Sequence, residues 1–231
     1  MPNDDLPTRI AELEADNRRL RCLLDKRDAP GELRHRFRST MAMLRTIVRK
    51  SAGTQRDLDS YVGHLEDRLD ALMRAQAIAD EQGAIDLHKL LADELLHYQA
   101  RDGDRTTIAG PDLHLQPRAG QVVALAVHEL AVNAVEHGAL GNGGTIDITW
   151  SVDGEGSDSI LTFIWKETDT AIAGAPSHNG FGTEVLTRTL VYELRAETDL
   201  AFESDGLRCT IRFPLSGRIG RQLERTIVKE S

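Results

Sequence analysis

The chain has 231 residues, of which 40% are hydrophobic and 28% charged, so it is long enough for one ordinary globular domain with helical extensions. Its formal charge of −9 and its 4% of aromatic residues exclude a basic surface with stacking platforms, and we expect no direct binding of nucleic acid. It contains neither a run of about 18 apolar residues nor a signal-peptide pattern, and we expect a cytoplasmic protein without membrane insertion.

Residues 1–30 contain a short pattern typical of a coiled coil. Apolar residues and one asparagine recur at steps of three and four: Ile10, Leu13, Asn17, Leu20 and Leu24. Asparagine in such a seam favours a parallel dimer, because the two amides satisfy each other only when the chains are in register. A single solvated helix is the alternative, and Pro30 with Gly31 ends the pattern in either case.

Residues 31–82 are predicted to form a helical hairpin. Its first apolar stripe consists of Leu33, Phe37, Met41, Leu44 and Val48. After a loop at 52–54, its second stripe consists of Leu58, Val62, Leu65, Leu69, Leu72 and Ile78. Two hairpins paired as a four-helix bundle would bury the remaining apolar surface, so we expect a homodimer. A monomer whose hairpin folds back on its own chain is the alternative.

Residues 83–216 have a different pattern, typical of an α+β domain. We expect helices at 85–100, 121–138 and 184–194, with a polar loop between the first two. Strands are predicted at 145–152, 159–167, 196–203 and 207–213, the last two joined by a tight turn. The helices should cover one face of a mixed sheet. Residues 217–231 form a charged tail in which we expect a terminal helix.

His35 is the first candidate for chemistry. At about 100° per residue, it points about 160° away from the apolar stripe of its own helix, so it faces solvent rather than a core. Arg34, Arg36 and Arg38 supply positive charge that would stabilise a phosphoryl group on the imidazole. A plain surface histidine in a solvated basic face is the alternative interpretation.

The second candidate is a polar stripe on the helix predicted at 121–138. Glu129, Asn133, Glu136 and His137 lie at i, i+4, i+7 and i+8, and this helix contains no lysine or arginine. The Asn133 amide oxygen suits a hydrated Mg²⁺, and Glu129 can orient or deprotonate a group through a water molecule. Such a stripe indicates a site for a nucleotide triphosphate.

The third candidate is the segment from His178 to Thr183, just before the last predicted helix. Gly180 and Gly182 would let backbone N–H groups approach phosphate oxygens, where the helix dipole favours negative charge. A lone Gly-x-Gly is weak by itself, but this one lies between Asn133 and the terminal hairpin.

In this order, the segments resemble four motifs of the HWE histidine kinases. ELRHRFRSTMAMLRTIV is similar to their phospho-acceptor box, and AVHELAVNAVEHGAL to their N box with its characteristic His128. Trp165-Lys166-Glu167 matches the family's Trp-x-Glu, and GFGTEVLTRTLVYELRAETDLAFESDGLRCTIRFPL resembles the G2 box and closing hairpin. The resemblance covers about 32–215 and implies a dimerising phospho-acceptor hairpin followed by an ATP-binding sandwich of the GHKL (Bergerat) fold.

The resemblance also implies roles for single residues. His35 would accept the γ-phosphoryl group of ATP and pass it to an aspartate in the receiver domain of a response regulator. Glu129 would be the base or orienting group, and Asn133 the Mg²⁺ ligand. The nucleotide would be bound by a larger set: Asn133, His137, Trp165, Glu167, Gly180, Gly182 and Thr183.

The chain departs from the family at three places. Ser39 replaces an asparagine, Glu136 replaces a lysine, and Thr168 to Ala171 replaces a Gly-Gly-Pro segment. Because the lost glycines allow backbone to approach the nucleotide, a phosphotransfer relay protein whose ATP-binding domain has decayed is the second hypothesis. An anti-sigma serine kinase is a third, but it would leave His35 unused. With only a predicted coiled coil before His35, two alternatives are open: a separate sensor protein supplies the signal, or the protein is a naturally sensorless form.

Overall fold

The computed structural model describes residues 58–100, 102–169 and 181–223. The chain divides into two units, 1–49 and 50–231, and all described residues belong to the second. The predicted coiled coil, the first helix of the hairpin and His35 therefore lie outside the described residues. The division into domains at 30, 82 and 216 remains a prediction.

The described helices and strands alternate along the chain. In order they are α3 (Leu58–Gln82), β1 (Ile85–Asp86), α4 (Leu87–His97), β2 (Thr106–Ala109), β3 (Leu113–Leu115), α5 (Pro117–Glu136), α6 (Ala139–Asn142), β4 (Thr145–Asp153), the 3-10 turn η1 (Gly156–Asp158), β5 (Ile160–Thr168), α7 (Phe181–Glu184), the π-helical turn η2 (Val185–Thr189), α8 (Leu190–Leu194), β6 (Glu197–Glu203), β7 (Gly206–Pro214) and β8 (Gly220–Gln222). Among these helices, none is long and apolar enough to cross a membrane.

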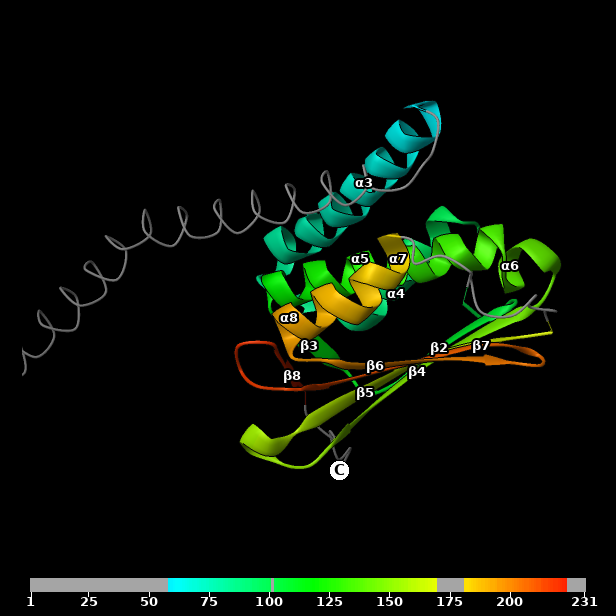
Figure 1. The fold of residues 1–231 in the computed structure, drawn as a ribbon. Helices are drawn as coiled ribbons and strands as arrows, with labels where there is room; N and C mark the ends of the chain where they lie inside the picture. Colours follow the sequence, from blue (N-terminus) through cyan, green and yellow to red (C-terminus); the bar gives the residue numbers. More distant parts are fainter. Residues whose placement is uncertain (1–57, 101, 170–180, 224–231) are drawn as a thin grey trace, which may run out of the picture. The chain divides into compact units, whose positions relative to one another are not determined.

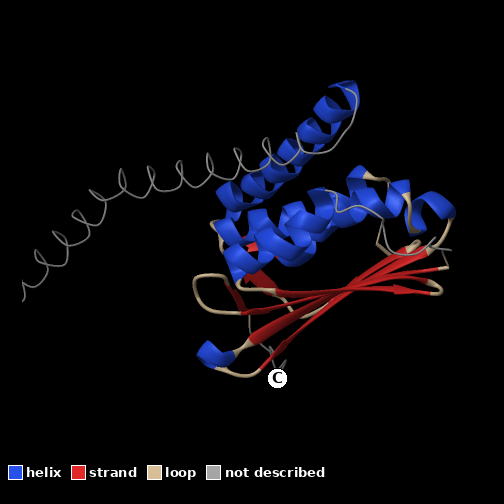
Figure 2. Ribbon diagram, in the orientation of Figure 1, coloured by secondary structure: helices blue, strands red, loops and turns tan. Residues whose placement is uncertain are grey.

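The main sheet has five strands in the order β2-β4-β5-β7-β6. The pair β2–β4 is parallel and the other three pairs are antiparallel, so the sheet is mixed. Helices α4, α5, α7 and α8 lie on one side of it, as the two colours of Figure 2 show. The predicted α+β class, with helices on one face of a mixed sheet, is confirmed.

The core forms where the strands turn alternate residues toward the helices. Along β5 the even–odd alternation buries Leu161, Phe163, Trp165 and Glu167, while the intervening side chains are half-buried. Residues paired across strands point to the same face, so apolar side chains line up in rows. Two such rows are Ile148–Trp165–Cys209 and Trp150–Phe163–Ile211. Glu167 is the acidic member of this largely apolar face, opposite Ile146.

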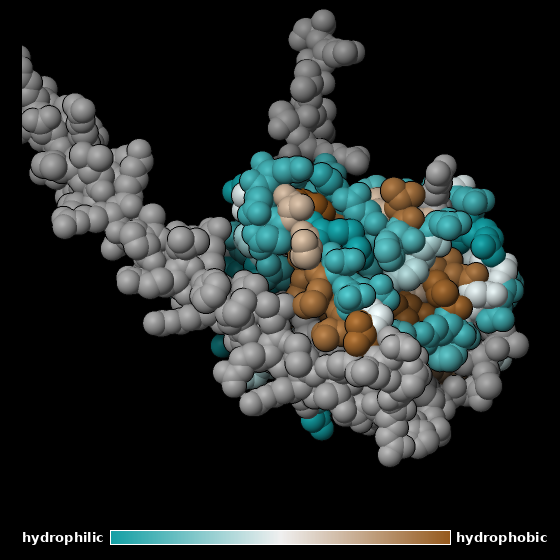
Figure 3. All heavy atoms as spheres, turned by 90° about the horizontal axis from the view of Figure 1, so that it is seen from above, coloured by the Kyte–Doolittle hydropathy of each residue, from teal (hydrophilic) through white to brown (hydrophobic). Residues whose placement is uncertain are grey.

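Helix α5 lies between the sheet and α3 and is buried over most of its length. It begins earlier than predicted, at Pro117, whose missing N–H is harmless in the first turn of a helix. Figure 1 shows α3 on the side of α5 away from the sheet. Seen from that side, the described surface is mainly hydrophilic, with apolar areas between the polar ones (Figure 3).

The stripe predicted for α3 is only partly right. Leu72 and Ile78 are buried, but Leu65 and Leu69 are half-buried and Val62 is 40% exposed. The buried face instead consists of Arg68, Ala71, Leu72, Ala75, Ile78 and Ala79. The alanines let α3 approach α5 closely, which the apolar periodicity of the larger side chains did not indicate.

A second, three-stranded antiparallel sheet was not predicted. Its order is β1-β3-β8, so it joins residues directly after α3 to residues near the end of the chain. Residues 106–109 and 113–115, expected as loop, are strands, and 85–86 is a strand rather than the start of the helix expected at 85–100. The terminal helix expected within 217–231 is wrong for residues 220–222, which form β8. Each of these strands has only two to four residues, too short for a periodic pattern.

Candidate functional site

The structure brings three predicted site residues together where α5 faces α7. Glu129 and Asn133 lie one turn apart on α5 and face Gly182 in α7. A Cβ atom added at Gly182 would lie 3.0 Å from Oε2 of Glu129 and 3.5 Å from Nδ2 of Asn133. A side chain there would crowd both polar groups, so the glycine keeps the space over them open.

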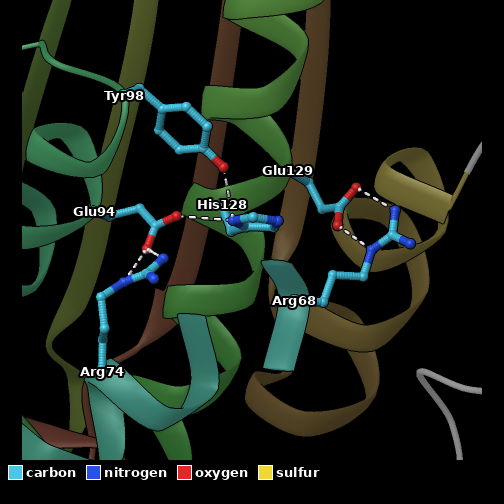
Figure 4. Close-up of polar contacts among 6 residues, drawn as sticks. All are labelled: Arg68, Arg74, Glu94, Tyr98, His128 and Glu129. Carbon is cyan, nitrogen blue, oxygen red and sulfur yellow. Dashed lines mark hydrogen bonds and ion pairs between the residues drawn. The ribbon is translucent and has the colours of Figure 1, made fainter. Parts of the chain in front are cut away.

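Glu129 is engaged by an arginine that the sequence did not single out. Arg68 of α3 donates from Nε to Oε1 of Glu129 at 2.7 Å and from Nη2 to Oε2 at 3.2 Å (Figure 4). Both residues are buried, with relative exposures of 8% and 4%. A fork of two parallel charge-assisted hydrogen bonds is the strongest geometry available to this pair of side chains.

His128, next to Glu129, takes part in a second buried network (Figure 4). Its Nδ1 lies 2.8 Å from Oε1 of Glu94 and 3.1 Å from the hydroxyl of Tyr98. Arg74 of α3 donates to the other oxygen of Glu94 at 2.6 and 3.2 Å. The histidine that characterises the N box is thus linked to α3 through one carboxylate.

Burial and charge in this network shift the pKa values of Glu94 and Tyr98. Burial raises the pKa of Glu94, but hydrogen bonds from His128 and Arg74 and their positive charge outweigh it, so the net pKa is below the usual range. Burial, together with the negative charge of Glu94, raises the pKa of Tyr98 far above its ordinary value. Glu94 is therefore an anion and Tyr98 a neutral hydrogen-bonding group at neutral pH.

Glu167 and Trp165 meet just beyond the C-terminal end of α5. The Glu167 carboxylate accepts a hydrogen bond from the backbone N–H of Ala139 at 2.7 Å and another from Nε1 of Trp165 at 3.1 Å. Both side chains are almost completely buried. Burial raises the pKa of Glu167, and the two hydrogen bonds only partly oppose that shift. A Cβ atom at Gly138 would collide with the Glu167 carboxylate, so a glycine is needed there.

The remaining predicted site residues are more scattered. His137 ends α5 at the surface, with its side chain 76% exposed and its backbone N–H bonded to the carbonyl of Asn133. Thr183 is half-buried in α7, and its carbonyl accepts a hydrogen bond from the hydroxyl of Thr187 at 2.7 Å. Gly180 lies outside the described residues. Asp169 has φ of +58°, a left-handed conformation that glycine adopts without strain.

Sequence reasoning missed the partners of the N box. The helical periodicity of Arg68 with Ala71 and Ala75 could have indicated that this arginine faces the interior. Glu94 stands among leucines in LHKLLADELLH, and an acid in such a run indicates a buried partner. Neither pattern reveals which residue is the partner, because the pairs are 61 and 20 residues apart.

The described fold is that of histidine kinase domains. It is similar to the histidine kinase domain of the blue-light-activated histidine kinase EL346 from Erythrobacter litoralis, with a TM-score of 0.53 at 21% identity, over 77% of this chain and 84% of that one. Residues 32–112 match the HWE histidine kinase family. The chain is thus similar to HWE histidine kinases, as its motifs predicted.

Curated relatives support the same assignment over most of the chain. A blue-light-activated histidine kinase of Brucella anthropi is 29% identical over 203 residues, which are 87% of this chain and 41% of the relative. Its counterpart in Brucella ovis is 28% identical over 191 residues, or 81% of this chain and 39% of that protein. The chain thus spans about two fifths of the length of these relatives.

Proposed function

We propose that this chain is an ATP-dependent protein-histidine kinase that phosphorylates its own His35 and passes the phosphoryl group to a response regulator. The main support is the convergence of Glu129, Asn133 and Gly182, which puts an acid and an amide beside an open glycine. A nucleotide triphosphate site needs these groups, and the N box of the family supplies them. The acceptor on the regulator would be an aspartate of its receiver domain.

The residues present fit a magnesium ion held jointly with a nucleotide. Mg²⁺ is usually bound through one or two protein oxygens together with waters and substrate phosphates. Asn133 can supply one such oxygen, and Gly182 next to it has no side chain to compete for that position. When bound, the ion would neutralise charge on the phosphates. Backbone N–H groups near Gly180, Gly182 and Thr183 would bind phosphate oxygens, with His137, Trp165 and Glu167 on the nucleotide's base side.

The transfer itself requires a base near the acceptor. A nitrogen of His35 forms a bond to the γ-phosphorus as the bond from that phosphorus to the oxygen of the departing ADP breaks. The proton on the imidazole must leave, and Glu129 would accept or orient it. The protein's contribution is then mainly positioning and charge neutralisation.

Incubation with Mg²⁺ and ATP labelled in the γ-phosphate tests this function. Wild type should acquire an acid-labile label, and His35→Ala and Asn133→Ala should not. His88→Ala is the matched control, because His88 is a half-exposed histidine on α4 with no proposed role. An unlabelled wild type, or label retained in His35→Ala, would contradict the proposal.

A test of nucleotide binding distinguishes the relay hypothesis from the proposed kinase. Asp169 lies in the segment that replaces the family's Gly-Gly-Pro and has a left-handed backbone conformation, which is the observation that favours a decayed site. A relay would show no thermal shift with Mg²⁺ and ATP but would accept phosphate from a phosphorylated receiver domain, whereas a kinase should be stabilised by the nucleotide. Light scattering would test the proposed homodimer, and co-purification would test a separate sensor protein.

A further inference from the structure

Helix α3 presents three basic side chains to three acids of the ATP-binding part. His64 lies 3.7 Å from Glu136, Arg68 pairs with Glu129, and Arg74 pairs with Glu94. We call these three contacts the α3 charge ladder. The acids come from α4 and α5, so the ladder joins one helix of the predicted hairpin to two helices that carry the N box and its neighbours.

The contact between Arg68 and Glu129 engages the carboxylate that the proposed reaction needs. Both oxygens of Glu129 accept from Arg68, in a setting where neither side chain is more than 9% exposed. A carboxylate whose two oxygens are both engaged by a guanidinium fork is less available to orient or accept another group. Little solvent reaches the pair, so salt would screen it weakly.

The other contacts hold α3 in the position that this pairing requires. Arg74 reaches Glu94, which in turn binds His128, the residue immediately before Glu129. A side-chain hydrogen bond from Gln121 to Gln76 at 2.6 Å adds a further link between α5 and α3. The alanine face of α3 lets the two helices lie close enough for all these contacts to form together.

We propose that α3 acts as an internal inhibitor of the ATP-binding part. Arg68 of α3 masks Glu129, and phosphoryl transfer requires the contact between Arg68 and Glu129 to open. This inference rests on the proposed function, since it takes Glu129 as a group that the reaction uses. The Arg74–Glu94–His128 contacts keep α3 attached while the Arg68 contact opens and closes. The signal reaching the hairpin would act by shifting this equilibrium, and nucleotide binding and release of α3 would favour each other.

Arg68→Gln tests the proposal, because it removes the positive charge and keeps a side chain of similar reach. The initial rate of autophosphorylation should rise at least about fivefold, the lower end of couplings between sites in proteins. Arg68→Lys keeps the charge without the fork and should give an intermediate rate. It also covers the case in which Arg68→Gln does not fold.

The matched control is Arg118→Gln. Arg118 makes an equally short fork to Glu193, at 2.6 and 3.1 Å, but that pair joins α5 to α8 and does not involve α3. Its loss should not raise the rate. A rise of the same size in Arg118→Gln would mean that general loosening, rather than release of α3, activates the protein, and would overturn the proposal.

A second readout does not depend on kinase activity. Spin labels at Met73→Cys on α3 and Tyr192→Cys on α8 occupy positions that are 68% and 86% exposed, while Cys209 is buried and Cys22 can be replaced by serine. The distance between them should lengthen or broaden in Arg68→Gln and stay unchanged in Arg118→Gln. An unchanged distance in Arg68→Gln would overturn the proposed release.

The two readouts separate failure of this inference from failure of the proposed function. A longer distance with a lower rate would mean that Arg68 assists the reaction, and masking would be wrong. If no variant acquires label while the distance still lengthens in Arg68→Gln, the kinase function fails and the hold of Arg68 on α3 is supported. A longer distance with a higher rate supports both.

Discussion

The backbone N–H of Ala139 lies 2.7 Å from Oε2 of Glu167, which joins the start of α6 to the end of β5. Because α6 follows α5 after only two residues, this bond fixes the C-terminal end of the N-box helix relative to the sheet. The same carboxylate is predicted to face the nucleotide. Burial and two hydrogen bonds within the protein hold the Glu167 carboxylate in place without a ligand.

Gly138→Ala should destabilise the protein. The added Cβ would collide with the Glu167 carboxylate and crowd Cα of Ala134, and overpacking of this kind costs about 1–3 kcal/mol. The free energy of unfolding in urea measures it. Gly63→Ala is the control, since a Cβ on that residue of α3 meets nothing within 4 Å and should be neutral or stabilising. Equal effects at the two positions would contradict this reading of Gly138.

Glu167→Gln should change how stability depends on pH. The folded pKa of Glu167 is raised above its ordinary value of 4.5, so its contribution to stability is fully present below that pH and is lost as the pH rises through the folded pKa. The difference in unfolding free energy, wild type minus Glu167→Gln, should therefore decrease from pH 4 toward neutrality. A difference that is constant or grows over this range would contradict the raised pKa.

Glu94→Gln should show the opposite dependence. The folded pKa of Glu94 lies below 4.5, so its contribution is present above that pH and is lost as the pH falls through the folded pKa. At neutral pH the substitution should lower the unfolding free energy by about 3 kcal/mol, because it leaves Arg74 and the buried His128 without their charged hydrogen-bond acceptor. In the same series of unfolding measurements, extended below pH 4, the difference in unfolding free energy between wild type and Glu94→Gln should decrease. If Glu94→Gln is as stable as wild type at pH 7, the buried network contributes nothing.

Asp169→Gly should stabilise the end of β5 and restore a family glycine. A non-glycine residue at φ of +58° carries strain of about 1 kcal/mol that glycine avoids, although the gain is reduced by the greater freedom of glycine in the unfolded chain. If the lost glycines weaken the nucleotide site, this variant should also bind a fluorescent ADP analogue more tightly than wild type. Unchanged affinity would show that position 169 does not limit binding.

Much of the fold could be predicted because its main elements carry regular patterns. Strands β4 to β7 agree with the predicted strands to within one residue at each end, since each alternates apolar residues with polar ones. The helix at α5 was predicted from its apolar run, although its first turn was missed. The short strands of the second sheet exist only through pairing with distant residues, which no local pattern reveals.

The candidate site was predictable in its residues but not in its contacts. The spacing of Glu129 and Asn133 places them on one face of a helix, and the structure brings Gly182 to that face. The partners of Arg68 and Arg74 could not be assigned from the sequence, because they lie 61 and 20 residues away along the chain. Which acid each arginine meets depends on how α3 packs on α4 and α5, which is a property of the whole fold.

The π-helical turn at Val185–Thr189 has a consequence for comparing this chain with its relatives. A π turn contains about one more residue than an α turn, so the side chains of α8 are rotated by about 100° from where an uninterrupted α-helix starting at α7 would place them. Leu190 and Leu194 nevertheless face inward, as Val185 and Leu186 do. A relative with a regular helix here would keep both sets of contacts with one residue fewer, and its alignment to this chain would need a single-residue gap within 185–189.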